Sequence, residues 1–497
     1  MSILISKSKY VSFVECPKKL WLKLYKPETE IITAATKKRL DAGTITGDLA
    51  MGYFGDYVDV TTYNGDRLDL NEMARLTLEE MNKGTENICE ASFFVDDLYC
   101  AVDILHKGKD GWEIYEVKST THVEDYHYHD SSFQCYVLSR FGLKISSVNV
   151  IVLDNTYVRN GELELNKLFK VNDVSLEASK LVPNIPKNLD KLREFIKNTT
   201  EPKNYISKAC DKPFECSFKD YCFKDIPTPS VFDLSGSRKK YDYYNENIVS
   251  FEDMYNSKYY KALTDANKRQ IIFELENKEM EINKEKVKDF LSKVTYPLYL
   301  LDFETMQPVV PLFDGTKPYQ QVTFQYSLHI IDENGNLSHK EFLADEGVMP
   351  CRKLALSLLN DIPKDKMIMA YNDTFEKTRI KELANMYPDL KDELLSRVDN
   401  FIDLMEPFKE QYIYKKEFKG SYSIKYILPG LFPDEDELDY HNLSIVHNGS
   451  EAMAIYENLL SYDIDERKEI RKALLEYCKL DTFAMVKILQ KLYELIK

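Results

Sequence analysis

The chain has 497 residues, of which 44% are hydrophobic and 30% are charged, and its formal net charge is −16. This length exceeds one ordinary hydrophobic core, so we expect two to four domains. No stretch approaches the roughly 18 apolar residues of a membrane-spanning helix, and the amino terminus lacks signal-peptide features, so we expect a cytoplasmic protein without a membrane partner. The acidic balance excludes indiscriminate nucleic-acid binding over the whole surface, but it leaves room for a local groove.

The first 225 residues carry the mixed helix and strand patterns of an α/β domain. Helical patterns cover residues 7–26, 30–54, 70–83 and 131–141, and strand-like runs cover 88–94, 98–105, 112–118 and 148–153. The polar, glycine-containing link at residues 106–111 predicts a hairpin between two of these strands.

This hairpin carries an acid on one strand and an acid–x–lysine triplet on the next. Asp103 precedes the link, and Glu116 and Lys118 alternate around Val117, so both face one side of their strand. The arrangement resembles that of PD-(D/E)xK nucleases, in which the acids hold Mg²⁺ or Mn²⁺ and the lysine stabilises charge or positions water. A cross-strand ion pair is the alternative for these residues alone.

The nine cysteines are odd in number, so they cannot all form disulfides, and a reducing compartment keeps them as thiols. Four of them form a pattern, with Cys16 near the start and Cys210, Cys216 and Cys222 about 190 residues later. Four thiolates can hold an iron–sulphur cluster or Zn²⁺. The two five-residue intervals are wider than the pairs of common zinc sites, which favours a [4Fe–4S] cluster, with Zn²⁺ as the alternative.

The pattern changes after this first domain. Residues 226–295 are predicted to be a helical connector, because the charged stretch 259–291 contains no glycine. Residues 296–497 return to an α/β pattern. Strands are expected near residues 297–303, 323–331 and 367–371, and helices at 351–359, 377–386 and 469–496.

Asp302 and Glu304 lie two residues apart at the end of an apolar strand-like run. Residues i and i+2 of a strand project from the same face, so both carboxylates are expected to enter one pocket. Two acids buried side by side are unfavourable unless a cation compensates them, and hard divalent ions prefer oxygen ligands. A solvated strand face is the alternative for this motif alone.

Three further residues complete a second constellation. Glu376 stands at the start of a predicted helix, and Tyr477 and Asp481 are spaced i,i+4 on a later helix and share one face. This order resembles the tyrosine-containing branch of the DnaQ-like (DEDD) 3′–5′ exonucleases, which have the RNase H-like fold. The resemblance implies that Asp302, Glu304, Glu376 and Asp481 hold two metal ions and that Tyr477 orients the attacking water. The family usually has aspartate where this chain has Glu376.

The first domain resembles RecB-like nucleases that carry an iron–sulphur cluster. By that resemblance Gln134, on a predicted helix, joins Asp103, Glu116 and Lys118 as a catalytic residue, and Asp48 is a further metal ligand. The usual Q-x3-Y spacing is not kept, because Leu138 stands four residues after Gln134. Together the two halves resemble an uncharacterised bacterial family that joins a RecB-like nuclease module at residues 1–225 to a DnaQ-like exonuclease module at residues 296–497.

Three functional hypotheses follow. The first is a metal-dependent nuclease with two active centres, acting on nucleic acid, with DNA favoured over RNA. The second is a nucleic-acid-binding or assembly protein with one or both centres inactive, which Glu376 and the altered glutamine spacing motivate. The third is an iron–sulphur or zinc protein such as a redox sensor, which leaves the acids of the second half unexplained. The sequence indicates no protein partner.

Overall fold

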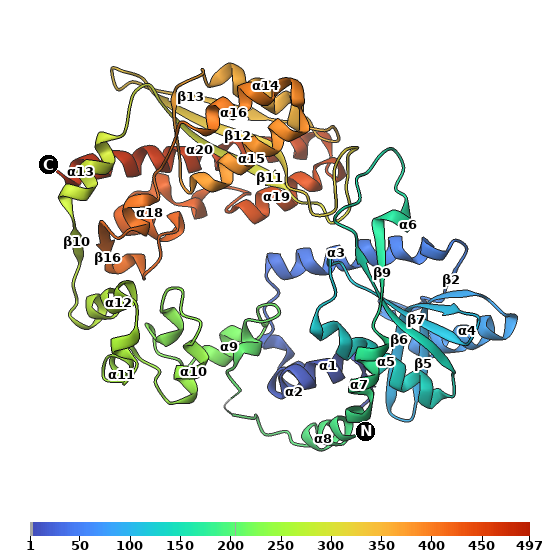
Figure 1. The fold of residues 1–497 in the computed structure, drawn as a ribbon. Helices are drawn as coiled ribbons and strands as arrows, with labels where there is room; N and C mark the ends of the chain where they lie inside the picture. Colours follow the sequence, from blue (N-terminus) through green and yellow to red (C-terminus); the bar gives the residue numbers. More distant parts are fainter. Residues whose placement is uncertain (1–2, 204) are drawn as a thin grey trace. The chain divides into compact units, whose positions relative to one another are not determined.

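The computed structural model describes residues 3–203 and 205–497 (Figure 1). The chain forms two compact units of mixed α/β structure. The first contains the chain up to Asp225 together with Pro308–Gln320, and the second contains Ile226–Gln307 and Gln321–Lys497. Residues 226–295, predicted to be a connector, thus cluster with the second unit. In the described residues no helix is both long and apolar enough to cross a membrane.

The first unit is built on a mixed sheet with strand order β2-β5-β6-β7-β8-β9, with β1 paired to β6. Strands β5, β6 and β7 are antiparallel neighbours, whereas β7 and β8 run parallel. The strands are β1 (Ile5–Ser6), β2 (Val58–Asp59), β3 (Tyr63–Asn64), β4 (Arg67–Leu68), β5 (Asn87–Val95), β6 (Leu98–Lys107), β7 (Trp112–Val117), β8 (Ile145–Leu153) and β9 (Phe169–Asp173).

Helix α5 packs against the four strands β5 to β8 of this sheet and closes its main core. The helices of the unit are α1 (Lys7–Glu15), α2 (Pro17–Tyr25), α3 (Ala34–Met51), α4 (Leu70–Lys83), α5 (Asp125–Phe141), α6 (Leu165–Leu168), α7 (Ser175–Leu181), α8 (Ile185–Phe195) and α9 (Lys219–Phe223). The single helix expected over residues 7–26 was wrong. It divides at Cys16, which is extended, because Pro17 lacks an N–H and starts a new helix.

A segment between two strands of the second unit, Pro308–Gln320, belongs to the first unit; we call it the strap. Val309 and Val310 are buried in a core cluster of the first unit. The guanidinium of Arg159 donates to the carbonyls of Pro311 and Leu312, at 3.0 Å each. These contacts fix a loop that no regular secondary structure holds.

The second unit has a five-stranded mixed sheet with order β13-β12-β11-β14-β15. Neighbours β11, β12 and β13 are antiparallel, and β11, β14 and β15 are parallel. Its strands are β10 (Met280–Ile282), β11 (Leu298–Met306), β12 (Val322–Ile331), β13 (Leu337–Leu343), β14 (Met367–Ala370), β15 (Phe401–Asp403) and β16 (Ile413–Lys415).

Helices cover both faces of this sheet, as alternate residues of β12 show. The hydroxyl of Tyr326 contacts Asp361 of α14 at 2.7 Å, whereas the hydroxyls of Ser327 and Thr482 of α20 lie 2.6 Å apart. The helices of this unit are α10 (Lys240–Asn245), α11 (Phe251–Tyr255), α12 (Asp265–Leu275), α13 (Lys284–Ser292), α14 (Cys351–Asp361), α15 (Asp373–Met386), α16 (Lys391–Val398), α17 (Glu406–Lys409), α18 (Ile424–Leu431), α19 (Gly449–Glu457) and α20 (Ile464–Leu495).

Candidate functional site

Two acids of the second unit lie on β11, the central strand of its sheet. Asp302 pairs with Ser327 of β12, and Glu304 pairs with Gln325. Residues directly opposite in an antiparallel pair share one face of the sheet. Because Ser327 and Gln325 both contact α20, Asp302 and Glu304 face that helix as well.

Helix α20 supplies the next three side chains of the site. Tyr477 is buried and Asp481 is half-buried one turn later. The Sγ atom of Cys478 lies 3.8 Å from Oδ2 of Asp302, and the ligand atoms of Asp302, Glu304 and Cys478 are within 4.8 Å of one another. Burial and the neighbouring acids raise the pKa of Cys478, so the thiol keeps its proton and donates to Asp302.

Glu376 comes from the first turn of α15, which packs against β11. The residue before this helix, Asn372, adopts a left-handed conformation with a φ of 71°, which asparagine tolerates. Glu376 is 2% exposed, and its Oε2 has no hydrogen-bond partner among the described residues. Burial raises the pKa of Glu376 to about 8.

The four carboxylates of this site act on one another electrostatically. Burial, followed by the charges of Asp481, Glu304 and Glu376, raises the pKa of Asp302 well above its ordinary value. Burial, followed by Asp481 and Glu376, does the same to Glu304. In the described part of the chain, no lysine or arginine forms an ion pair with any of the four. Without a bound cation, this site must therefore take up protons as it is buried.

Asp481 receives hydrogen bonds from two tyrosines, one of which the sequence did not indicate. The hydroxyl of Tyr440 donates to Oδ1 of Asp481 at 2.6 Å. Burial raises the pKa of Asp481 to about 7, although hydrogen bonds from Tyr440 and Tyr477 and the charge of Lys425 lower it. Its Oδ2 has no hydrogen-bond partner within the described residues. Tyr440 begins a three-residue 3₁₀ helix (Tyr440–Asn442), which is too short to show periodicity, so no sequence pattern marks it.

Gly449 borders the same site at the start of α19. A Cβ atom built there would lie 3.7 Å from Oε2 of Glu304 and 3.8 Å from the hydroxyl oxygen of Tyr477. These are ordinary van der Waals distances, so the backbone of α19 closes one side of the acid cluster without crowding it.

These donors fit hard divalent cations such as Mg²⁺ or Mn²⁺. The site offers four carboxylates, and the unpartnered oxygens of Glu376 and Asp481 can each accept one more bond. Two ions at one carboxylate cluster can clamp the attacking and leaving oxygens of a displacement at phosphorus.

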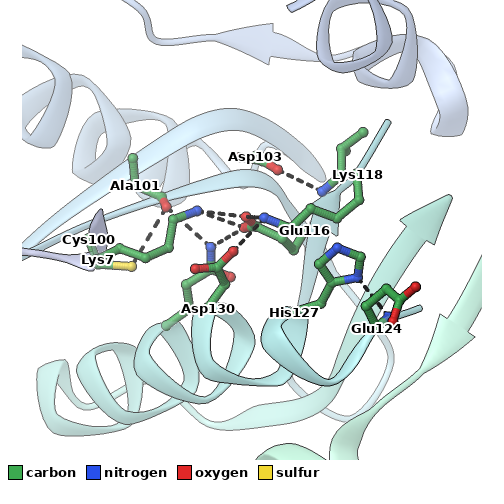
Figure 2. A network of polar contacts seen from close by, with 11 residues as sticks. Lys7, Cys100, Ala101, Asp103, Glu116, Lys118, Glu124, His127 and Asp130 are labelled. Atoms are coloured by element: carbon green, nitrogen blue, oxygen red, sulfur yellow. Dashed lines mark hydrogen bonds and ion pairs between the residues drawn. The ribbon is translucent and has the colours of Figure 1, made fainter. Parts of the chain in front are cut away.

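The first unit holds a second polar cluster around Glu116, which is buried near the end of β7 (Figure 2). The ammonium of Lys7 lies 2.7 and 2.9 Å from the two carboxylate oxygens of Glu116. The ammonium of Lys118 lies 2.8 Å from Oε1, and the amide of Gln134 donates to Oε2. Burial opposes ionisation, yet Lys118 and Lys7 lower the pKa of Glu116 to about 2.

Asp103 and Asp130 complete this cluster. The backbone N–H of Val117 donates to Oδ2 of Asp103 at 2.6 Å, and burial with the charge of Glu116 raises the pKa of Asp103 to about 6. The ammonium of Lys118 lies 2.5 Å from Oδ2 of Asp130 on α5. The structure thus brings together the four predicted residues of the hairpin and α5.

Two residues of the first unit differ in position from the sequence-based prediction. Asp48 lies on α3 with an exposed side chain, and none of the described hydrogen bonds joins it to Glu116. Instead, Glu90 of β5 falls opposite Asp103 at a position where β5 and β6 do not pair although their register continues unchanged, and its φ is 55°. Burial and Asp103 raise the pKa of Glu90 to about 7. Lys7 and Glu90 lack any local motif, so sequence reasoning missed both.

The four patterned cysteines converge in the first unit. Cys16 caps α2, Cys222 lies in α9, and the N–H of Cys216 donates to the carbonyl of Cys210 at 2.9 Å. Burial, followed by the other three thiols and opposed by Lys18, raises the pKa of Cys222 to about 11. All nine cysteines of the chain are free thiols. Four thiols from two distant segments therefore offer the donor set of an iron–sulphur cluster or Zn²⁺.

Comparison with known proteins gives relatives without an assigned activity. Residues 299–423 match a family described as a domain of unknown function (DUF2779), a stretch that contains Asp302, Glu304 and Glu376 but ends before Tyr477. The chain is 23% identical over 407 residues to "Uncharacterized protein MG366" of Mycoplasma genitalium, covering 73% of this chain and 61% of the relative. It is 25% identical over 223 residues to "Uncharacterized protein MG366 homolog" of Mycoplasma pneumoniae, covering 41% of this chain and 33% of that protein.

The chain thus spans about three fifths of the length of the first relative and a third of the second. No solved structure matches the chain significantly.

Proposed function

We propose that this chain is a metal-dependent nuclease and that its second unit is a 3′–5′ exonuclease of the RNase H-like, DnaQ-like class. The supporting observation is the group of four interacting carboxylates without a cationic partner in the described residues, Asp302, Glu304, Glu376 and Asp481. Buried acids of this kind are retained at functional sites that bind metal ions.

The five-stranded sheet supports this assignment, because the acids come from its central strand β11, from α20 on one face and from the first turn of α15, which also packs against β11. Two divalent ions held by these acids would activate a water and neutralise charge at the leaving oxygen. Burial and the charges of Asp481 and Glu304 raise the pKa of Tyr477. Its hydroxyl therefore keeps its proton, which it donates to Asp481, and its oxygen can accept a hydrogen bond from the attacking water.

For the first unit we propose a RecB-like PD-(D/E)xK fold with a [4Fe–4S] cluster on Cys16, Cys210, Cys216 and Cys222, with Zn²⁺ as the alternative. The convergence of the four thiols supports the cluster. A reducing compartment such as the cytoplasm keeps such thiols available. The substrate of the protein is nucleic acid, with DNA favoured over RNA.

The first unit also supports a second candidate function, nucleic-acid binding without cleavage. The ammonium of Lys7 contacts both carboxylate oxygens of Glu116. These are the oxygens that Glu116 would offer to a metal ion. An ammonium in that position neutralises the carboxylate without a metal. In this alternative the first unit holds the strand and only the second unit cuts it.

A nuclease assay tests both assignments. Protein purified without oxygen is incubated with Mn²⁺ and 5′-labelled single-stranded DNA or RNA, beside the variants Asp302→Asn and Lys118→Ala. We expect stepwise shortening from the 3′ end that Asp302→Asn loses and Lys118→Ala retains. No cleavage of any substrate by the wild type, or unchanged shortening by Asp302→Asn, contradicts the exonuclease assignment.

A further inference from the structure

A cavity of about 580 Å³ lies beside Lys118 in the first unit. Its volume is within the range of small-molecule sites, which reach roughly 300–1,000 Å³. Although the chain has 82 aspartates and glutamates, none of the described residues that line this cavity is acidic. The walls include two cations, three aromatic rings and a histidine: Arg39, Lys118, Tyr126, Phe214, Tyr319 and His127.

His127 is one of the residues that line this cavity, and it has a hydrogen-bond donor that no described group uses. The side chain is fully buried, and its Nδ1 accepts the backbone N–H of Glu124 at 3.1 Å, as Figure 2 shows. Burial and the charge of Lys118 lower the pKa of His127 to about 4, so the ring is neutral at pH 7. A neutral ring that accepts at Nδ1 carries its proton on Nε2. Nε2 has no hydrogen-bond partner in the described part of the chain.

Another part of the cavity wall is aromatic. The guanidinium carbon of Arg39 lies 3.9 Å from the ring centroid of Phe214, and the rings of Tyr126 and Phe214 are 5.9 Å apart. Phe214 is 41% exposed, so its ring remains accessible to a ligand. The strap adds Tyr319, whose hydroxyl donates to the carbonyl of Ser119 next to Lys118.

We propose that this cavity binds one nucleotide of a single-stranded nucleic acid, with the base against Phe214 and Tyr126 and a phosphate oxygen on Nε2 of His127. Arg39 supplies positive charge for the phosphate, and aromatic rings accept any base because every base has a stacking face. The identity of the ligand as a strand rests on the proposed function. The buried donor and the acid-free wall stand independently of it.

Binding and crosslinking together test this site. The probe is a 12-nucleotide single strand of deoxythymidine with a 5′ fluorophore, measured by anisotropy on the full chain in EDTA so that no cleavage is required. Phe214→Ala and Arg39→Ala are each expected to weaken binding roughly 5- to 100-fold, the range of one lost stacking or cation contact. The matched controls are Tyr63→Ala, an exposed aromatic on β3, and Arg140→Ala at the end of α5. Both are expected to bind like the wild type.

Because the second unit can also bind the strand, a strand carrying 5-iododeoxyuridine locates the contact. Irradiation followed by mass spectrometry is expected to give crosslinks at Tyr126, Phe214 or Tyr319. A crosslink only in the second unit, or equal affinities of Phe214→Ala and Tyr63→Ala, overturns the proposal. Thymidine monophosphate is tested in the same way. If it binds as tightly as the strand and Phe214→Ala weakens both equally, the ligand is a free nucleotide, and the proposal of a strand is overturned.

His127 provides a readout that does not depend on affinity. In a protein labelled with ¹⁵N-histidine, the Nε2 resonance is expected to shift when the strand is added, and Phe214→Ala is expected to reduce that shift. Cleavage with an unmoved Nε2 resonance supports the proposed nuclease but contradicts this site. Pocket-dependent binding without cleavage in Mn²⁺ contradicts the nuclease and retains the site.

Discussion

The two acid clusters balance their charge in different ways. In the second unit, the charges of Asp481 and Glu376 add to burial in raising the pKa values of Asp302 and Glu304, and no cation of the described residues forms an ion pair with these four carboxylates. In the first unit, Glu116 is contacted by the ammonium groups of Lys7 and Lys118, which lower its pKa to about 2. The first cluster is therefore neutralised by the chain itself, whereas the second depends on protons or on metal ions.

This difference has opposite consequences for stability as pH changes. An acid whose pKa is raised by folding stabilises the folded state while it is protonated, and that stabilisation is lost as pH rises through the folded pKa. An acid whose pKa is lowered by folding stabilises the folded state above its unfolded pKa, and this stabilisation is lost as pH falls through its folded pKa. Glu376 exemplifies the first case, with a pKa of about 8, and Glu116 the second.

The largest expected effect comes from the thiols of the first unit. Cys16→Ser removes one of the four thiols proposed to bind the cluster, at the junction of α1 and α2. Because metal binding contributes folding free energy, we expect loss of bound iron and a fall in melting temperature of about 10 °C or more. Iron analysis and calorimetry measure both.

The matched control for Cys16→Ser is Cys135→Ser, a half-buried free thiol on α5 outside this group. It should keep the iron. Full iron content and unchanged melting in Cys16→Ser contradict the cluster assignment.

Lys7→Met sharpens the comparison by removing one cation from Glu116. Breaking a buried ion pair from one side costs roughly 3–5 kcal/mol, and the 21% exposure of the Lys7 side chain reduces that figure to about 1–3 kcal/mol. The expected result is lower stability in EDTA at pH 7, with Mn²⁺ restoring more stability than it adds to the wild type. Urea unfolding with and without Mn²⁺ measures this. Lys83→Met, on an exposed helical ion pair, should change stability little; equal losses in both variants contradict the role of Lys7.

Glu376→Gln should stabilise the metal-free protein at alkaline pH. The wild type loses stability between pH of about 4.5 and 8, because the unfolded chain releases the proton of Glu376 in this range whereas the folded protein keeps it. At about 1.4 kcal/mol for each pH unit, the substitution is expected to add a few kcal/mol at pH 8 in EDTA while it abolishes metal-dependent cleavage. Thermal melts from pH 5 to 8 test this. Identical pH profiles for Glu376→Gln and the wild type contradict the predicted protonation.

Tyr440→Phe is expected to have the smallest effect. It removes the hydrogen bond from Tyr440 to Oδ1 of Asp481, a proposed metal ligand that this bond would orient. Loss of such an outer contact typically costs about 10-fold in metal affinity. Titration with Mn²⁺ gives the affinity, and Tyr426→Phe on the exposed face of α18 is the control. A Tyr440→Phe protein with the affinity of its control contradicts this role.

Local periodicity accounts for what the sequence could predict about these clusters. The spacing of Asp302 and Glu304 on a strand, and of Tyr477 and Asp481 on a helix, places each pair on one face wherever those elements pack. The acid–x–lysine triplet at Glu116 and Lys118 follows from the same alternation. The mixed α/β class was confirmed for the same reason, since long periodic segments define it.

Residues that join the two clusters only through tertiary contacts show no local periodicity that could have predicted them. Lys7 reaches Glu116 from a helix 109 positions away in sequence, and Tyr440 reaches Asp481 from a three-residue 3₁₀ helix. Glu90 adopts a positive φ at an unpaired position of β5 opposite Asp103, which residue type alone does not reveal. The strap is a loop whose docking depends on partners such as Arg159 that lie far away in the chain.

The most direct test of the account is the number of Mn²⁺ ions that the second unit holds. Calorimetric titration of the full chain is compared with Asp302→Asn and with Glu116→Gln, an equivalent substitution in the cluster that the chain neutralises itself. We predict that Asp302→Asn loses two tightly bound ions relative to the wild type and that Glu116→Gln retains both. Equal Mn²⁺ binding by Asp302→Asn and the wild type would contradict the claim that these carboxylates form a two-metal centre.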